Sequence, residues 1–414
     1  MRVEVIAIGD ELLIGQTINT NASWMGQLLA TNGGTVQYAT VVQDTEEAIL
    51  DAVDHALNRV DVVLMTGGLG PTKDDITKHT LCKYFETSLA INEEVLARIT
   101  HFFEIRGREM LEVNRQQAAL PIGSTTLLND QGTASGMWFE KDGKILVSMP
   151  GVPYEMKHLM VDKVLPKLKE RFEMKAMYHR TLHLQGIGES FLAEKISDIE
   201  DRIHADGIGL AYLPSPGIVR LRLTSNKEVE KERKIEQYLK ELEARLPKHA
   251  FGREEDQLSG VVGSLLKRKG MTLGCVESCT AGALSSEVVS IPGASAYFMG
   301  SIVSYSNALK ANFVGVPMDF IENHGAVSEE VVKSMAANGR QLLGVDYCLS
   351  ISGVAGPDGG SEEKPVGTVW IGLASANKLI AKRFLFGDQR DRNIRMSVLA
   401  ALNMLRCDLL EIKM

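Results

Sequence analysis

Met271-Thr-Leu-Gly-Cys-Val-Glu-Ser-Cys-Thr280 is the stretch around which the last third of the chain is organised. A short apolar run ends at Glu277 and small residues then lead into a helical pattern, which predicts a strand-to-helix turn at Ser278 and Thr280. The first amides of a helix lack partners within the helix and attract phosphates and oxyanions. The turn is therefore a favourable place for a nucleophile, although a Ser or Thr that only caps a helix leaves the same letters.

Two later segments carry further candidate chemistry. The first is Tyr297-Phe-Met-Gly-Ser-Ile-Val-Ser-Tyr-Ser-Asn-Ala-Leu-Lys310, which predicts a strand followed by a short helix. We expect Asn307 to cap this helix and Lys310 to lie in its first turn. A cation at the start of a helix interacts unfavourably with the helix dipole and costs roughly 0.3–1 kcal/mol of stability. Lys310 therefore either extends its charged end into water or serves a function. The run from Val345 to Gly360 predicts an apolar strand that opens into a Gly-rich loop, which lets the backbone approach a ligand closely.

Four motifs in this region match one family: Glu277-Ser-Cys-Thr280, Tyr305-Ser-Asn307 with Lys310, His324-Gly-Ala-Val-Ser328, and Ser352-Gly-Val-Ala-Gly-Pro-Asp-Gly-Gly-Ser-Glu-Glu-Lys-Pro-Val-Gly-Thr368. Residues 258–414 thereby resemble the nicotinamide-nucleotide amidohydrolase domain of the CinA family. The resemblance implies that Ser278 is the nucleophile, that Lys310 is its base and that Tyr305 lies nearby. It implies an α/β domain that deamidates nicotinamide mononucleotide without a cofactor.

The residues are suited to that chemistry. Carboxamide hydrolysis needs an activated nucleophile, a proton donor for the leaving ammonia and donors for the oxyanion. A neutral Lys310 can take the Ser278 proton if burial lowers its pKa, and the amides from Thr280 to Gly282 can hold the oxyanion. A Ser-His-Asp triad is disfavoured because His324 is the one histidine of the region and its setting predicts a loop before a helix. Cys279 is a rival nucleophile, but a cysteine there is more often a small buried hydrophobe.

The sequence departs from the family pattern at two places. Ala281-Gly282 stands where two glycines are usual, and we expect Ala281 to fit the start of a helix. The second departure is Gly387-Asp-Gln-Arg-Asp-Arg-Asn-Ile-Arg395, which is one residue longer than the Gly-Asp-Arg segment usual in the family. The arginine that binds the phosphate is therefore Arg390, Arg392 or Arg395. The substrate-binding residues expected in this domain are Thr280, Gly282, Gly353, Gly356, Arg392 and Arg395.

The composition excludes some classes of protein. The chain has 414 residues, 44% of them hydrophobic, and a net charge of −8, which argues against broad binding of nucleic acid or membrane. Its five cysteines show no Cys-x-x-Cys spacing, so neither a disulfide framework nor a zinc site is indicated. No apolar run reaches the ~18 residues of a membrane helix. We expect a cytoplasmic homodimer.

The first part of the chain alternates strand and helix patterns, which predicts a parallel α/β sandwich. The third expected strand is followed by the segment Thr66-Gly-Gly-Leu-Gly-Pro-Thr-Lys-Asp-Asp-Ile-Thr77. In this segment a glycine-rich loop continues directly into the first turn of a helix, and that turn contains acidic residues. Backbone amides of Gly67, Gly68 and Gly70, with Thr72, are suited to a phosphate, and the acids to a divalent ion beside it. The competing interpretation is a capped helix whose first-turn acids only favour the dipole.

This first part also resembles a known domain. The matching letters are Gly9-Asp-Glu-Leu-Leu-Ile-Gly15 with Asn19-Thr-Asn21, the Gly67 loop, Asn114-Arg-Gln-Gln-Ala118, and Met149-Pro-Gly-Val-Pro-Tyr-Glu-Met156. They resemble the molybdopterin-binding-like domain of CinA proteins, over residues 1–168. The resemblance implies an ADP-ribose pyrophosphatase that uses Mg²⁺ or Co²⁺. The metal ligands expected by position are Asp44 and Asp75, with Asp10 and Asp74 as alternatives.

Residues 175–250 predict a small α+β module, which is KH-like in the family. Gly186-Ile-Gly188 lacks the Gly-x-x-Gly spacing of RNA-binding KH units, so we interpret the module as a spacer or dimerisation element. The leading hypothesis is a bifunctional enzyme of pyridine-nucleotide recycling that acts on nicotinamide mononucleotide and ADP-ribose. The alternative is a competence-associated interaction protein in which one or both sites are inactive.

Overall fold

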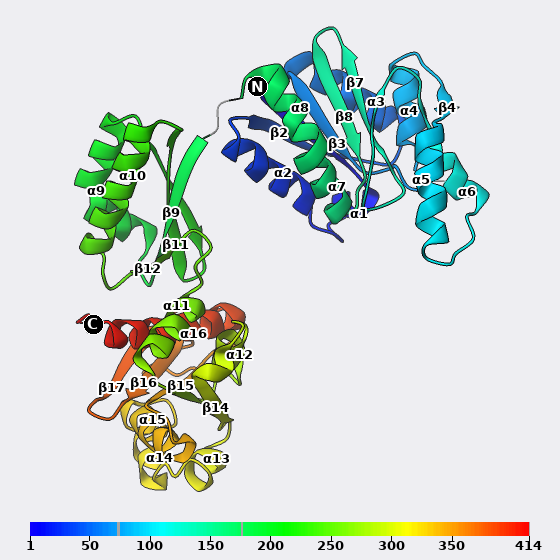
Figure 1. Cartoon of the computed structure of the whole chain (residues 1–414). Coiled ribbons are helices and arrows are strands. Elements are labelled where there is room, and N and C mark those ends of the chain that lie inside the picture. The colour runs from blue at the N-terminus through cyan, green and yellow to red at the C-terminus, as the bar shows by residue number, and fades with distance from the viewer. Residues whose placement is uncertain (73–74, 175–176, 414) are drawn as a thin grey trace. The chain divides into compact units, whose positions relative to one another are not determined.

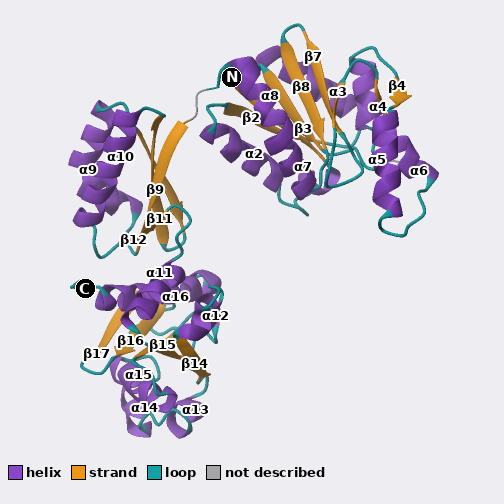
Figure 2. Ribbon diagram, in the orientation of Figure 1, coloured by secondary structure: helices purple, strands orange, loops and turns teal. Residues whose placement is uncertain are grey.

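The computed structural model describes residues 1–72, 75–174 and 177–413. The chain forms two compact units, Met1–Tyr178 and His179–Met414, and each is described by itself (Figure 1). Both units are mixed α/β structures with helices packed on sheets (Figure 2). No helix within the described ranges is long and apolar enough to cross a membrane.

The first unit is built on a six-stranded sheet with the order β2-β1-β3-β8-β7-β6. The adjacent strands β2, β1, β3 and β8 run parallel to one another. Strand β7 is antiparallel to β8, and β6 is antiparallel to β7. The expected parallel sheet therefore ends at β8, because Asp142 (φ 51°) and Gly143 (φ 75°) fold the chain into a tight hairpin. The strands are β1 (Arg2–Ile8), β2 (Thr35–Val42), β3 (Val62–Thr66), β6 (Thr125–Leu127), β7 (Gly136–Lys141) and β8 (Lys144–Met149).

Both faces of this sheet are buried, because side chains alternate along its strands. Val3 and Val5 of β1 pack into one apolar cluster, whereas Ile6 and Ile8 pack into the cluster on the opposite face. Helices cover each face. They are α1 (Asp10–Leu13), α2 (Thr20–Thr31), α3 (Glu46–Arg59), α4 (Thr77–Tyr84), α5 (Glu93–Glu104), α6 (Glu112–Arg115), η1 (Gln116–Ala118), α7 (Pro153–Leu159), η2 (Met160–Val164) and α8 (Leu165–Phe172), beside the small sheet of β4 (Leu89–Ile91) and β5 (Ala119–Pro121).

The middle module is a four-stranded sheet with the order β10-β11-β9-β12 and two helices that pack together on it. Its elements are β9 (Met177–Gln185), α9 (Glu189–Ala205), β10 (Gly209–Ser215), β11 (Ile218–Asn226), α10 (Val229–Arg245) and β12 (Ala250–Arg253). The range 175–250 taken from the sequence stops at the first residue of β12. β12 completes the sheet by pairing antiparallel to β9.

The C-terminal part is a five-stranded sheet with the order β14-β13-β15-β16-β17. β14, β13 and β15 are parallel, and β16 and β17 follow as antiparallel strands. Its elements are α11 (Leu258–Lys269), β13 (Leu273–Glu277), α12 (Ala283–Val289), η3 (Ala294–Ala296), β14 (Phe298–Val303), α13 (Asn307–Asn312), α14 (Met318–His324), α15 (Glu329–Leu343), β15 (Tyr347–Gly353), β16 (Thr368–Ala374), β17 (Leu379–Leu385) and α16 (Arg390–Leu409).

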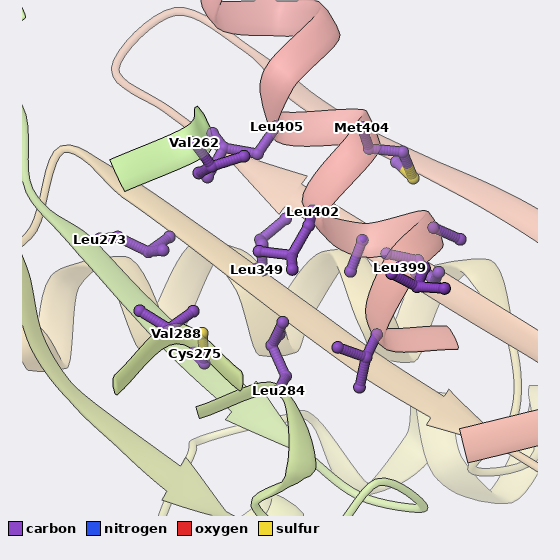
Figure 3. Packing of buried hydrophobic residues seen from close by; sticks show 14 of the residues in the cluster. Val262, Leu273, Cys275, Leu284, Val288, Leu349, Leu399, Leu402, Met404 and Leu405 are labelled. Atoms are coloured by element: carbon purple, nitrogen blue, oxygen red, sulfur yellow. The ribbon is translucent and has the colours of Figure 1, made fainter. Parts of the chain in front are cut away.

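The core of this part fixes β13 between two helical layers. On one face Leu273 and Cys275 of β13 and Leu349 of β15 pack against Leu402 and its neighbours on α16 (Figure 3). On the other face α15 covers the sheet through a second apolar cluster. Each fully buried large aliphatic side chain contributes about 1.5–3 kcal/mol. The carboxyl ends of β13, β14 and β15 thus meet at one rigid edge, where ligands bind in open α/β sheets.

Candidate active sites

Ser278 and Lys310 meet at this edge of the C-terminal sheet. Ser278 directly follows β13, and its Oγ lies 2.9 Å from Lys310 Nζ, which α13 carries back toward the sheet. Lys310 is only 1% exposed and Ser278 is 7% exposed. The structure therefore brings together the two residues that the sequence predicted as nucleophile and base.

The hydrogen bonds of Lys310 suit a neutral amine. Its Nζ lies 2.9 Å from the backbone oxygen of Ser304 and 3.1 Å from that of Tyr305. A neutral amine has two N–H groups for these two carbonyls, which leaves its lone pair directed at the Ser278 hydroxyl. Burial lowers the pKa of Lys310, and no ion pair among the described residues offsets this effect. The geometry thus favours a lysine that accepts the Ser278 proton.

The cap of α13 differs from the sequence prediction. Ser306 rather than Asn307 precedes the helix, and its Oγ accepts a hydrogen bond from the Leu309 amide at 3.2 Å. The Asn307 prediction was wrong by one residue because β14 ends at Val303 and Ser304 and Tyr305 form the connecting turn. That turn supplies the two carbonyls that hold Lys310.

Glu277 occupies the start of α12, which the sequence reasoning had assigned to an oxyanion. Its fully buried carboxylate accepts hydrogen bonds from the amides of Gly282 (2.9 Å), Leu284 (3.1 Å) and Ser285 (2.9 Å). The Gly282 amide is therefore not free for an oxyanion, and this part of the prediction was wrong. A carboxylate at the end of a buried strand just before a helix is the sequence signal that we missed.

The turn between Ser278 and α12 leaves two other amides available. Ala281 (φ 49°) and Gly282 (φ 101°) both have left-handed backbone, so the expectation that Ala281 fits a helix start was wrong. Among the described residues, no oxygen acceptor contacts the amides of Cys279 and Thr280. The Thr280 hydroxyl is buried and also lacks a partner. These groups next to Ser278 can donate to an oxyanion.

The alternative catalytic residues are less suited. Burial raises the pKa of Cys279 to about 11, so the thiol is protonated near neutral pH and is a weak nucleophile. His324 ends α14 and has a partly exposed ring whose Nδ1 lies 3.9 Å from Glu330. The segment after His324 is a loop before α15, as the sequence predicted, and Ser328 caps that helix by accepting a hydrogen bond from the Val331 amide. Ser278 remains the better candidate.

Tyr305 and an arginine form the outer part of this site. The Tyr305 side chain is exposed and its hydroxyl lies 3.5 Å from Arg390 Nη2, while Arg390 Nη1 donates to the Gly356 carbonyl at 2.8 Å. Of the three arginines left open by the sequence, the structure places Arg390 here. Arg392 lines a different cavity, and Arg395 is exposed on α16.

Two of the predicted glycines are required by close packing. A Cβ on Gly353 would lie 2.6 Å from Val369 Cγ2, and one on Gly356 would lie 2.5 Å from Val366 Cγ1. Any side chain at either position would displace the loop that presents the Gly356 carbonyl to Arg390.

The first unit has a second candidate site at the end of β3. A cavity of about 430 Å³ is lined by the predicted glycine loop and by Asp44 and Asp75. Gly67 (φ 116°) and Gly68 (φ 64°) have backbone that other residues adopt only with strain, and a Cβ on Gly68 would lie 2.1 Å from Thr77 Oγ1. The glycines thus permit a tight loop at the wall of the cavity.

Carboxylates converge in this second cavity. Burial raises the pKa of Asp44, and the neighbouring carboxylates of Asp10, Glu11 and Asp75 raise it further. A divalent cation would relieve this repulsion, so the chemistry of the donors fits a metal. The described residues nevertheless contain no group of three His, Cys, Asp or Glu side chains arranged as a metal site, and Asp74 lies outside them.

The other residues of this cavity differ from the prediction in their roles. The amide and hydroxyl of Thr72 donate to Asp75 Oδ2 at 2.8 and 2.5 Å, so Thr72 orients a candidate ligand. Glu155 and Gln117 also line the cavity, and the sequence reasoning assigned neither of them. Burial raises the pKa of Glu155, and the buried Gln117 Oε1 accepts no hydrogen bond from the residues that the structure describes. Both lie in motifs that carried the resemblance.

Comparison with known proteins identifies the family. Three family models match: the CinA C-terminal domain at residues 255–409, a "probable molybdopterin binding domain" at 4–170 and the damage-inducible protein CinA KH domain at 179–252. A CinA-like protein of Cytophaga hutchinsonii is 44% identical over 412 residues, which are 99% of this chain and 98% of the relative. The chain belongs to the CinA family.

Further CinA relatives match across the chain or one part of it. A CinA-like protein of Flavobacterium psychrophilum is 39% identical over 99% of both chains. The crystal structure of a CinA protein with unknown function from Thermoplasma acidophilum is 35% identical, with a TM-score of 0.37 over 40% of this chain and 96% of that one. That of the competence/damage inducible protein CihA from Agrobacterium tumefaciens is 30% identical, with a TM-score of 0.36 over 37% of this chain and 93% of that one.

Proposed function

We propose that this CinA-family protein hydrolyses the carboxamide of nicotinamide mononucleotide to nicotinate mononucleotide and ammonia. The observation that carries the proposal is the 2.9 Å contact between Ser278 Oγ and the Nζ of a buried lysine, Lys310, whose other partners are two backbone carbonyls. The substrate is suggested by the resemblance to nicotinamide-nucleotide amidohydrolases, and the contact supplies a nucleophile with a base.

The first half of the reaction forms an acyl-enzyme. Ser278 Oγ attacks the carboxamide carbon while Lys310 Nζ takes the hydroxyl proton, and the amides of Cys279 and Thr280 donate to the developing oxyanion. The Lys310 ammonium then protonates the departing nitrogen, so the C–N bond breaks and ammonia leaves. Ser278 remains bound to the acyl group as an ester.

The second half releases the acid. Lys310, neutral again, removes a proton from water, and the hydroxide attacks the ester carbon. The bond to Ser278 Oγ breaks, and Lys310 returns the proton to that oxygen. The balance is one carboxamide and one water converted to one carboxylic acid and ammonia. None of these steps requires a cofactor.

Arg390 is the residue that we assign to the phosphate of the substrate. It lies at the exposed side of the site beside Tyr305 and Gly356, and a guanidinium binds phosphate oxygens in pairs. Of the two predicted arginines, Arg395 remains the alternative to it, because Arg392 lines a different cavity. The exposed Tyr305 ring beside it offers a flat surface for the nucleotide.

We propose a second activity, hydrolysis of the ADP-ribose pyrophosphate, for the first unit. The supporting observation is that a glycine loop and the carboxylates of Glu11, Asp44 and Asp75 line one cavity. Asp44 and Asp75 would hold Mg²⁺ or Co²⁺, which when bound supplies charge neutralisation for the pyrophosphate. The glycine loop would bind the phosphate oxygens through its amides.

Two variants of the full-length protein test these proposals separately. Ser278→Ala should lose ammonia release from nicotinamide mononucleotide and keep metal-dependent cleavage of ADP-ribose, whereas Asp75→Ala should show the reverse. Unchanged ammonia release in Ser278→Ala would contradict the amidase, and unchanged ADP-ribose cleavage in Asp75→Ala would contradict the second site. An unmodified protein without either activity would favour the competence-associated interaction protein.

A further inference from the structure

A separate cavity of about 500 Å³ lies where the middle module meets β17 and α16 within the second unit. Its two sides are joined by hydrogen bonds. Arg406 Nη2 donates to the Pro247 carbonyl at 3.0 Å and to the Lys248 carbonyl at 2.9 Å, and Asn403 Nδ2 also donates to the Lys248 carbonyl at 3.0 Å. These bonds hold the walls of the cavity together.

Three cationic side chains collect around this cavity, and one of them, Lys382, has its Nζ 5.4 Å from the centroid of the Phe384 ring. Lys248, Lys382 and Arg392 line it, and none of them forms an ion pair among the described residues. The carboxylate that lines it belongs to Glu189. Because the chain as a whole carries a net charge of −8, three uncompensated cations at one cavity indicate a site for an anion.

Arg406 adds a buried positive charge beside the same wall. It is only 2% exposed, and among the described residues its hydrogen-bond partners are carbonyl, amide and thiol groups rather than a carboxylate. Burial raises the pKa of the neighbouring Cys407, which lines the cavity, and Asp408 acts in the same direction, whereas Arg406, Lys382 and Lys248 lower it. Three cations thus lie close enough to the cavity wall to act on its thiol. A buried guanidinium without an anion is costly, so a bound anion would stabilise it.

Part of the remaining wall is apolar, beside the polar side chains of Gln185, Ser215 and His249. The rings of Phe384 and Phe386 are stacked, with centroids 5.5 Å apart and an interplanar angle of 17°. Met396, Met404 and Ile218 complete this side. A cavity of this size accommodates a small organic ligand, and an aromatic and thioether surface suits a planar ring. The site thus combines a surface for a ring with cations for an acidic group.

We infer that this cavity binds a nucleoside phosphate, with the phosphates on Lys248, Lys382 and Arg392 and the base against Phe384, Phe386 and the methionines. The site is separate from the Ser278 site, but both use α16. Arg390 at the start of α16 contacts the Gly356 loop, and the following turns of the same helix line this cavity. The inference does not depend on the proposed amidase.

Hydrogen–deuterium exchange of the full chain, followed by mass spectrometry, tests the site with ADP as the probe. Saturating ADP should slow exchange in the segments 185–189 and 215–219, which contribute to the cavity wall. Any binding of ADP to the first unit would slow exchange in other peptides. Adenosine, which lacks phosphate, should not slow exchange in the two segments. No slowing of these segments with ADP, or equal slowing with adenosine, would overturn the inference.

Charge-reversed variants locate the contacts. Lys248 and Lys382 are exposed at the rim, so the double variant Lys248→Glu and Lys382→Glu should fold with an unchanged melting temperature. We expect its affinity for ADP at this site to fall by at least about tenfold, a loss of about 1.4 kcal/mol. The matched control is Lys240→Glu, an exposed lysine on α10 that is outside the cavity lining. Retained protection in the double variant, or equal loss in the control, would contradict the site.

Discussion

The two units each contain a buried lysine that binds backbone carbonyls, and the two lysines differ in one partner. Lys310 Nζ contacts two carbonyls and the Ser278 hydroxyl. Lys78 Nζ, on α4 of the first unit, contacts three carbonyls, those of Gln116 (3.1 Å), Gln117 (3.5 Å) and Ala119 (3.2 Å). Burial lowers the pKa of both lysines.

The difference in partners favours a different charge state for each lysine. Three carbonyls need three N–H donors, which only an ammonium has, so Lys78 is suited to a charged state and to holding the η1 segment in place. Asp75 nearby also raises the pKa of Lys78, in opposition to burial. Lys310 has two carbonyls and a hydroxyl that can itself donate, which a neutral amine satisfies. These partners fit the proposed role of Lys310 as a base and a structural role for Lys78.

The largest expected effect is the loss of deamidation in Lys310→Ala. We expect a fall in kcat of at least about 10³-fold, and the double variant with Ser278→Ala should lose little more because the two residues act as one unit. Lys78→Ala is the matched control and should leave ammonia release unchanged. Near-normal turnover by Lys310→Ala, or an equal loss in Lys78→Ala, would break the comparison between the two lysines.

The pH dependence of kcat/KM should follow the titration of Lys310. Because the proposed active form is the neutral amine, the rate should rise with pH through the lowered pKa of Lys310, below the ordinary range of lysine. Lys310→Arg should be inactive at every pH, since a guanidinium does not deprotonate. A rate that falls over this range, or an active arginine variant, would contradict a lysine base.

The same shift links stability to pH. The folded state binds fewer protons at Lys310 than the unfolded chain does, because the folded-state pKa is the lower one. The free energy of unfolding attributable to this residue should therefore increase as the pH rises from the lowered pKa toward the ordinary lysine value.

Lys78→Ala should lower stability rather than the amidase rate. It removes a cation that satisfies three carbonyls, so we expect a loss of about 1–3 kcal/mol in the unfolding of the first unit. Thermal unfolding followed by a probe in the first unit measures the effect. An unchanged melting temperature would show that the η1 segment does not depend on Lys78.

The smallest expected effect is a gain in stability in Ala281→Gly. Ala281 has φ 49°, where a Cβ costs roughly 1–2 kcal/mol, and the entropy of glycine offsets part of this. We expect a net gain of about 0.5 kcal/mol in thermal unfolding of the second unit. The control is Ala283→Gly in the first turn of α12, which should be destabilising by up to about 1 kcal/mol. A loss of stability in Ala281→Gly would contradict the strain.

The sequence predicted the parts of the sites that depend on local pattern. The strand before Ser278, the helix that carries Lys310, and the glycine loop at Gly67 followed from periodicity and turn residues. The pairing of Ser278 with Lys310, 32 positions apart, came from the family resemblance. Strand pattern alone does not specify which loops meet at the edge of a sheet.

The parts that were missed depend on tertiary contacts or on backbone angles. Glu277 was quoted only as part of a motif, because its hydrogen bonds form once the chain turns back at Ala281 and Gly282. Glu155 and Gln117 reach the first unit's cavity from elements distant in sequence from the glycine loop. The letter Ala at position 281 also gave no sign of its left-handed backbone.

One measurement tests the contrast between the two sites most directly. The unmodified full-length protein is given nicotinamide mononucleotide and ADP-ribose together with Mg²⁺, and ammonia and AMP are followed before and after a chelator is added in excess. The account predicts that AMP formation stops while ammonia release continues at the same rate, because Lys310 and not a metal activates Ser278. Ammonia release that stops with the chelator would contradict the account.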